Sequence, residues 1–191
     1  WHMINDKHNL KQALANHVAR SAEKLRSQDC LCGEICVFIN TNRFRKKDLQ
    51  YNNSAILPFD DLTDNTNIIM KKAFKVLDRL YRPNYSYKKI GVILLNLKQR
   101  KKDVMNNNYV IQDNLFTYNR NYKNNANESD ICMKILDDIN TKMGKMSLFY
   151  GSQGIIKHSG KNKIETDKWR IRSFYRSPFY TTNWADILKV S

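Results

Sequence analysis

A chain of 191 residues with 41% hydrophobic and 11% aromatic residues can bury one core of ordinary size and a small satellite, which excludes wholesale disorder. Its 33 lysines and arginines outnumber 18 aspartates and glutamates, giving a formal charge of +15. Such a surplus opposes compaction unless a polyanion neutralises it, so nucleic acid is the first partner to expect. An acidic membrane surface comes second, because the positive charge is scattered over strands and loops rather than along one amphipathic helix.

Three features of the sequence bear on where in the cell the protein is located and on whether the chain is a fragment. No apolar run approaches the roughly 18 residues that cross a bilayer, so we expect no membrane segment. The start Trp1-His2-Met3 is typical of a cloning scar joined to an internal fragment, and we expect the natural chain to begin upstream. Cys30, Cys32, Cys36 and Cys132 lack the spacing of zinc ligands, which predicts reduced thiols in a cytoplasm.

The first elements in chain order are a helix and two strands. Apolar residues at helical spacing predict the helix, and they are Leu10, Leu14, Val18, Ala22 and Leu25. The β-branched run 34–39 predicts a strand. A second strand is predicted over 54–59, and Pro58 confines it to an edge or an end of a sheet.

A second helix and a third strand follow. The polar residues 64–67 offer N-cap oxygens for a helix that starts near residue 66, and Arg82-Pro83-Asn84 ends it. Residues 89–97 carry apolar side chains on both faces, which predicts a strand in the centre of the sheet.

The rest of the chain is less regular. The apolar residues of 98–128 follow neither the helical nor the strand periodicity, which is typical of a functional or disordered connection. Ser129 is a cap for a helix that Gly144 ends, with an apolar stripe of Ile131, Ile135, Leu136, Ile139 and Met143. A short strand is predicted over 147–150, followed by a basic segment rich in aromatic residues.

These segments resemble the C-terminal part of UmuC-like Y-family translesion DNA polymerases, along nearly all of the chain. The segments similar to the little-finger domain of that family are Ala22-Glu23-Lys24-Leu25-Arg26, Phe38-Ile39-Asn40-Thr41, Tyr51-Asn52-Asn53-Ser54-Ala55 and Tyr87-Lys88-Lys89-Ile90-Gly91-Val92. Gln112-Asp113-Asn114-Leu115-Phe116 resembles the sliding-clamp-binding peptide, and Ser177-Pro178-Phe179-Tyr180-Thr181-Thr182-Asn183-Trp184 resembles the C-terminal signature of the group.

The resemblance implies an α+β fold with a mixed helix and sheet domain and a small α+β C-terminal module. The expected divisions are a scar at 1–3, the little finger at 4–98, a flexible linker at 99–128 and the C-terminal domain at 129–191. The first strand of the family's little finger is missing, so one sheet edge is expected to be open to another chain or to residues 147–150. The palm and fingers, which carry the catalytic carboxylates and the Mg of the parent polymerase, are missing too.

The resemblance also implies contacts with the DNA backbone. Lys88 and Lys89 match a basic pair of the family and are expected to contact phosphates without reading sequence. From composition we add the loop residues Arg43, Arg45, Lys46 and Lys47, for which the alternative is a solvated run of charge. Thr41 is a further candidate, as a hydroxyl donor to phosphate.

The clamp peptide would place Leu115 and Phe116 in an apolar cleft while Gln112 fixes the register. The alternative is that Leu115 and Phe116 fold into the core. The C-terminal module contains the aromatic residues Trp169, Tyr180 and Trp184. They either fill the core of this small module or stack on the bases of single-stranded DNA. The resemblance allows a UmuD-like accessory protein and the recombinase filament as further partners.

The sequence offers little evidence for a catalytic site. Adjacent carboxylates at 60–61 and 137–138 point apart and make no tight cage for a metal, and neither His17 nor His158 has an acidic neighbour at a telling spacing. We therefore expect no catalytic residue, metal or cofactor in this chain. The hypothesis is a non-catalytic part of an error-prone polymerase of the SOS response, located in the bacterial cytoplasm at the nucleoid, which binds primer-template DNA and the sliding clamp. The alternative is a free-standing basic RNA-binding or ribosome-binding module.

Overall fold

A computed structural model describes residues 3–45, 47–100, 120–144, 146–154, 158–159 and 163–164. The chain divides into two compact units, Trp1–Ile155 and Ile156–Ser191. In the second unit, β4 (His158–Ser159) pairs in antiparallel fashion with β5 (Lys163–Ile164). No helix in the described part of the chain is both long and apolar enough to cross a membrane.

The first helix, α1 (Lys7–Ser27), forms as the spacing of its apolar residues predicts. Asp6 caps it, since its carboxylate accepts hydrogen bonds of 3.2 Å from the backbone amides of His8 and Asn9. All five predicted apolar positions are buried, at Leu10, Leu14, Val18, Ala22 and Leu25.

The sheet of the first unit has the order β2-β1-β3, with both pairings antiparallel. Its strands are β1 (Cys30–Thr41), β2 (Asn52–Thr63) and β3 (Tyr87–Gln99). The prediction that Pro58 lies in an edge strand is confirmed, because β2 pairs with β1 alone.

The prediction that residues 89–97 form the central strand is wrong, since β1 occupies the centre and β3 an edge. The inward residues of β3 pack on the core, among them Ile90 and Val92. Its outward apolar residues stay accessible, with Ile93 48% and Leu97 53% exposed. Apolar residues on both faces of β3 therefore do not reflect burial on both faces.

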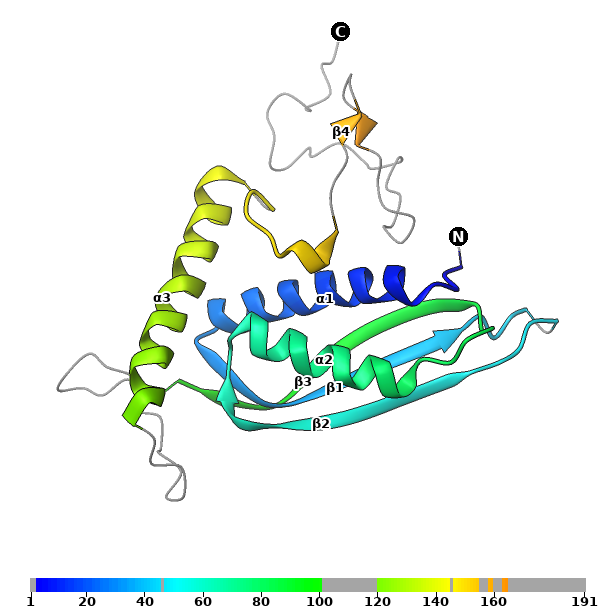
Figure 1. Ribbon diagram of the computed structural model, residues 1–191, viewed down its shortest axis with the longest axis horizontal. Helices are drawn as coiled ribbons and strands as arrows, with labels where there is room; N and C mark the ends of the chain where they lie inside the picture. Colours follow the sequence, from blue (N-terminus) through cyan, green and yellow to red (C-terminus); the bar gives the residue numbers. More distant parts are fainter. Residues whose placement is uncertain are drawn as a thin grey trace, which may run out of the picture. The chain divides into compact units, whose positions relative to one another are not determined.

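Two helices cover one face of the sheet, and no described helix or strand covers the other face (Figure 1). The second of them, α2 (Thr66–Leu80), begins where it was predicted, because Asn65 accepts hydrogen bonds from the amides of Asn67 and Ile68 at 2.8 and 3.3 Å. The core lies between the helices and the inward residues of β1, which are Ile35, Val37 and Ile39. The α+β class and the order helix, strand, strand, helix, strand are confirmed.

The N-terminal residues reach the free edge of β3 at one position. Ile4 and Tyr87 exchange two backbone hydrogen bonds of 3.0 Å, which make an isolated antiparallel bridge. Beyond this bridge, no described residue pairs with the outer edge of β3. Among the described residues, this edge of β3 is therefore open except for a single bridge.

The predicted strand at 147–150 is wrong. These residues form a turn that leads into a 3-10 helix, η1 (Gly151–Gln153). The side-chain amide of Asn140 accepts from the Leu148 N–H and donates to the Leu148 carbonyl, both at 2.9 Å. One side chain thus satisfies the two backbone groups that a strand partner would satisfy.

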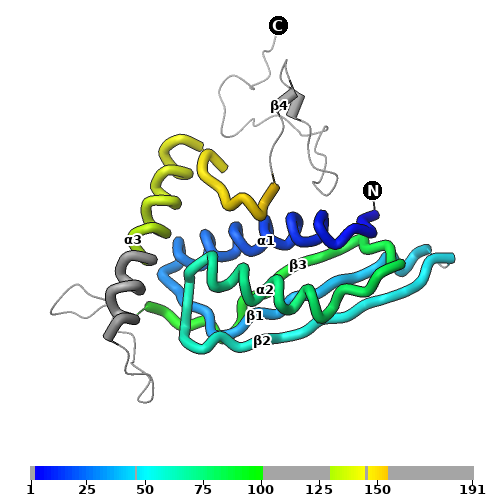
Figure 2. Tube along the Cα trace, viewed as in Figure 1, coloured from blue at the N-terminus to red at the C-terminus, as the bar shows by residue number. Residues whose placement is uncertain are grey.

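The third helix, α3 (Arg120–Met143), begins well before Ser129, within the segment predicted to be a linker. It ends at Gly144, whose φ of 105° suits glycine, as predicted. Figure 2 shows α3 beside the end of α1 that leads into β1. The predicted stripe of α3 is largely outward, since Ile131, Ile135 and Met143 are exposed; Met133 is buried instead.

Candidate nucleic-acid interface

The predicted phosphate-binding residues Lys88 and Lys89 lie at the start of β3, beside an irregularity in its pairing with β1. Asn40 is paired with Lys89 and Thr41 with Tyr87, so Lys88 is an extra residue on β3. Such a bulge re-aims side chains at the end of a strand. Both lysines therefore border the loop that joins β1 to β2.

That loop is held together by one side chain. The amide of Gln50 donates to the carbonyls of Asn42, Arg45 and Asp48 at 3.3, 2.9 and 3.0 Å. Two backbone turns add to it, from Arg45 N to Asn42 O at 3.0 Å and from Asp48 N to Arg45 O at 3.1 Å. A loop with this many internal bonds presents its side chains with little loss of entropy on binding.

The loop and the strand ends enclose a cavity of about 320 Å³. Its lining residues are Asn40, Thr41, Asn42, Arg43, Phe44, Gln50, Tyr51, Asn52, Lys88 and Lys89. Four of the residues predicted to bind DNA thus meet at one site, and none of its described lining residues carries a carboxylate. Arg45 and Lys47 are exposed elsewhere on the loop, and Lys46 lies outside the described residues.

The Thr41 hydroxyl is already used by the protein. It accepts a hydrogen bond from the Tyr51 N–H at 3.0 Å and donates to the Gln50 side-chain oxygen at 3.2 Å. Donation to a phosphate would require Thr41 to leave Gln50. In this structure Thr41 positions the loop.

Sequence reasoning missed the role of Phe44 and Asn42 in this site. Phe44 is 81% exposed, and the Lys88 ammonium lies 5.6 Å from the centre of its ring. Asn42 accepts a hydrogen bond from the same ammonium at 3.3 Å. The aromatic residue between Arg43 and Arg45 was the available signal, but nothing in the sequence connected it to a lysine 44 positions later.

A second cavity, of about 250 Å³, has the opposite character. Six carboxylates line it together with two arginines and a lysine, and its residues include Glu23, Asp29, Asp64, Asp130, Asp137 and Asp138. Asp29 precedes β1 and Thr41 ends it, so the acidic and basic cavities lie roughly 35 Å apart along the strand. A polyanion is therefore favoured at one end of the sheet and disfavoured at the other.

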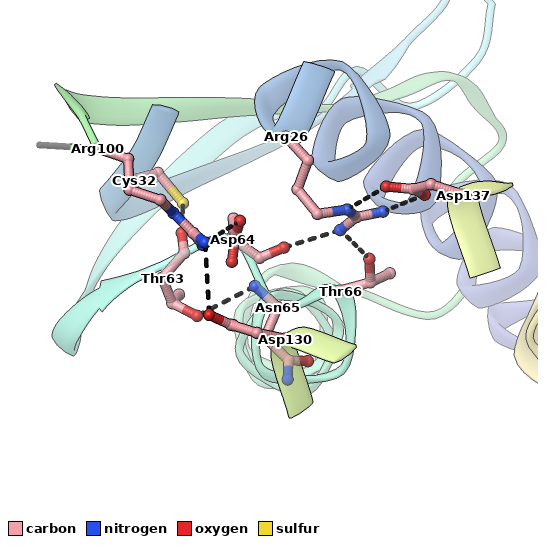
Figure 3. Close-up of polar contacts among 9 residues, drawn as sticks. All are labelled: Arg26, Cys32, Thr63, Asp64, Asn65, Thr66, Arg100, Asp130 and Asp137. Atoms are coloured by element: carbon pink, nitrogen blue, oxygen red, sulfur yellow. Dashed lines mark hydrogen bonds and ion pairs between the residues drawn. The ribbon is translucent and has the colours of Figure 1, made fainter. Parts of the chain in front are cut away.

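Buried polar groups gather at the acidic end (Figure 3). Burial raises the pKa of the Asp64 carboxyl; the Arg100 charge opposes this and the Asp130 charge adds to it. Burial also raises the pKa of the Cys32 thiol to about 12, with a further contribution from Asp64. Cys32 donates a hydrogen bond to the Thr63 carbonyl at 3.1 Å, as expected of a protonated thiol.

The acidic pairs considered for catalysis have structural partners. Asp60 lies 3.4 Å from the Lys72 ammonium, and Asp137 forms an ion pair of 2.6 Å with Arg26. Among the residues that the structure describes, no three His, Cys, Asp or Glu side chains are grouped to hold a metal ion. The clamp-peptide residues Gln112, Leu115 and Phe116 lie outside the described residues, as do Trp169, Tyr180 and Trp184.

Comparison with known proteins shows the family of the chain. Residues 2–107 match the model of the impB/mucB/samB family C-terminal domain, and residues 132–190 match a domain of unknown function, DUF4113. The chain is 31% identical to Protein UmuC of Salmonella typhimurium over 98% of its own length and 39% of that protein. It is 30% identical to Protein MucB of Salmonella typhimurium over 93% of its length and 37% of that protein.

Protein ImpB of Salmonella typhimurium is 28% identical over 96% of the chain and 38% of its own length. The chain thus spans less than two fifths of the length of these curated relatives. The family match covers more than half of the chain and the whole three-stranded sheet with its two helices. The chain therefore belongs to the impB/mucB/samB family and corresponds to the C-terminal region of a UmuC-like Y-family polymerase.

Proposed function

We propose that this chain binds the backbone of primer-template DNA through the basic end of its sheet, as a non-catalytic region of an error-prone translesion polymerase. The observation that supports the proposal is the cavity that brings Arg43, Lys88 and Lys89 together, with no carboxylate among its described lining residues. The guanidinium of Arg43 on the preorganised loop and the ammonium groups of Lys88 and Lys89 at the start of β3 suit phosphate oxygens, which give affinity without sequence information.

The test is the binding of a labelled primer-template duplex to the Lys88→Ala/Lys89→Ala chain. The matched control is Lys71→Ala/Lys75→Ala, which removes the same charge from two exposed lysines of α2, the helix on the covered face. We expect the first variant alone to weaken binding by at least tenfold. Equal losses in both variants would mean that only net charge matters.

Binding is also expected to be nearly independent of sequence. Unrelated duplexes should differ in affinity by less than about tenfold, because phosphates are common to all sequences. The alternative of an RNA-binding or ribosome-binding module is favoured by nothing in the described fold. A strong preference for RNA over the duplex in the same assay would revive it.

We further propose that Gln112, Leu115 and Phe116 tether the protein to the bacterial sliding clamp. The support is the sequence: a glutamine three residues before an adjacent leucine and phenylalanine, in a polar stretch without periodicity. Titration of the chain with the clamp should give micromolar affinity, about −8 kcal/mol. Leu115→Ala/Phe116→Ala should abolish it, and binding that persists in this variant would exclude the tether.

The remaining proposals concern the longer protein. We propose that DNA synthesis and its Mg belong to the part of the relatives that this chain does not span. We further propose that the protein acts in translesion repair and SOS mutagenesis in the bacterial cytoplasm, at the nucleoid. A UmuD-like accessory protein and the recombinase filament are the further partners. A primer-extension assay with this chain and Mg should show no nucleotide incorporation, and incorporation would contradict a non-catalytic role.

A further inference from the structure

One buried arginine joins α3 to the end of α1. The guanidinium of Arg26 donates to both carboxylate oxygens of Asp137, at 2.6 and 2.8 Å. Its remaining nitrogen donates to the Asp64 carbonyl at 2.8 Å and the Thr66 hydroxyl at 2.9 Å (Figure 3). The Arg26 side chain is only 9% exposed. Without Asp137, this guanidinium would lose its only described counter-ion within bonding distance.

A second arginine makes the same connection from the end of β3. Arg100 forms an ion pair of 2.6 Å with Asp64 and a longer one of 3.4 Å with Asp130 of α3. The side chains of Arg100 and Asp64 are both 9% exposed. Although burial lowers the pKa of Arg26, the Asp137 hydrogen bonds and charge leave that pKa above its ordinary value. The charged form of Arg26 is thus stabilised by its contact with α3.

The chain is anchored again after α3. The Asn16 amide of α1 donates to the Gln153 carbonyl at 2.9 Å, and the Gln153 amide contacts the Asn16 oxygen at 3.3 Å. Both residues are buried, at 5% and 6% exposure. Tyr150 packs on the main core and donates to the Met133 sulfur at 3.4 Å. Contacts to the sheet and its helices therefore flank α3 on both sides.

The family matches divide the chain differently from these contacts. One match ends at residue 107 and the other begins at residue 132, inside α3. We propose that α3 and residues 3–100 form one body whose docking does not need the covalent connection 101–119, so that this connection leaves and re-enters the same body. Arg26 and Arg100 are the positioning residues of that docking.

If α3 docks in this way, any binding peptide within 101–119 is tethered at both of its ends to the same body. A segment fixed at both ends samples a smaller volume than a linker between two independent modules, which raises its effective concentration near the body. If residues 112–116 bind the clamp, the chain before them and the chain after them would belong to the same body. The docking itself rests neither on clamp binding nor on DNA binding.

The test is to cleave the connection 101–119 in the full 191-residue chain and to ask whether the two pieces stay together. A recognition sequence for a specific protease is inserted between Asn107 and Asn108, and the cut protein is analysed by gel filtration in native buffer. We expect both pieces to elute together at the volume of the uncut chain. Separate elution of the two pieces would overturn the proposal.

Asp137→Ala and Asp138→Ala make a matched pair of variants in the same assay. Asp138 is the exposed neighbour and carries the same charge, so its cut chain should elute as one species. Cut Asp137→Ala should separate into two. Joint elution of the Asp137 variant would contradict the assignment of docking to the ion pair. Circular dichroism of the uncut chains checks folding, and Asp137→Asn, which keeps the shape of the side chain, replaces Asp137→Ala if that variant is unfolded.

Discussion

The ring of Phe38 lies directly over Gly91 on the open face of the sheet, where the two residues are paired across β1 and β3. A Cβ atom at position 91 would lie 2.3 Å from the Phe38 Cζ and 2.7 Å from its Cε1. Glycine at this position therefore lets the aromatic ring lie flat on the sheet. The pair Asn40 and Lys89, which lines the basic cavity, lies two residues further along these strands.

Gly91→Ala should destabilise the protein by about 1–3 kcal/mol, because the new methyl group must displace the Phe38 ring. Urea unfolding measures the change. Gly151→Ala is the control, since no atom lies within 4 Å of a Cβ at that position. In the double variant Phe38→Ala/Gly91→Ala, the loss should be smaller than the sum of the single losses. Strict additivity would show that the ring does not constrain position 91.

The loop between β1 and β2 should depend on Gln50 for its shape. Gln50→Ala removes hydrogen bonds to three carbonyls, and hydrogen exchange at the amides of Arg45 and Asp48 should become faster. DNA affinity should fall as the loop loses its preorganisation. Leu49→Ala, which truncates a side chain that is 62% exposed in the same loop, should change neither quantity. Unchanged exchange in the Gln50 variant would show that the backbone turns alone fix the loop.

The cysteines should differ sharply in reactivity. Burial holds the pKa of Cys32 at about 12, so at pH 8 its sulfur is almost entirely the unreactive thiol. Cys132 is exposed and should give the fastest reaction with a thiol reagent. Cys132→Ser should remove this fast phase, and modification of Cys32 should appear only on unfolding. Rapid labelling of Cys32 in the folded chain, located by mass spectrometry, would contradict its burial.

The sequence predicted the local elements well, because the signals for them are local. The stripe from Leu10 to Leu25 and the cap at Asn65 placed α1 and α2, and Pro58 placed β2 at an edge. Arg43, Lys88 and Lys89 were each predicted to contact DNA, from the charged loop and from the resemblance, but their meeting at one cavity was not predicted.

Long-range relationships were not predictable in the same way. The apolar pattern of β3 suggested a central strand because periodicity does not distinguish a buried face from an accessible one. Arg26 and Asp137 are 111 residues apart, and nothing local marks either as half of a pair. The strand expected at 147–150 failed for a related reason, since Asn140 supplies the hydrogen bonds from a neighbouring helix.

The central claim is that the basic end of the sheet holds DNA phosphates, and the salt dependence of duplex binding tests it most directly. For the unmodified chain, the logarithm of affinity should fall with the logarithm of salt concentration, with a slope of about −0.9 per phosphate contacted. Lys88→Ala/Lys89→Ala should make this slope shallower by about one to two, whereas Lys71→Ala/Lys75→Ala should leave it unchanged. A slope that is the same in the Lys88/Lys89 variant as in the unmodified chain would remove these lysines from the DNA contact and contradict the account.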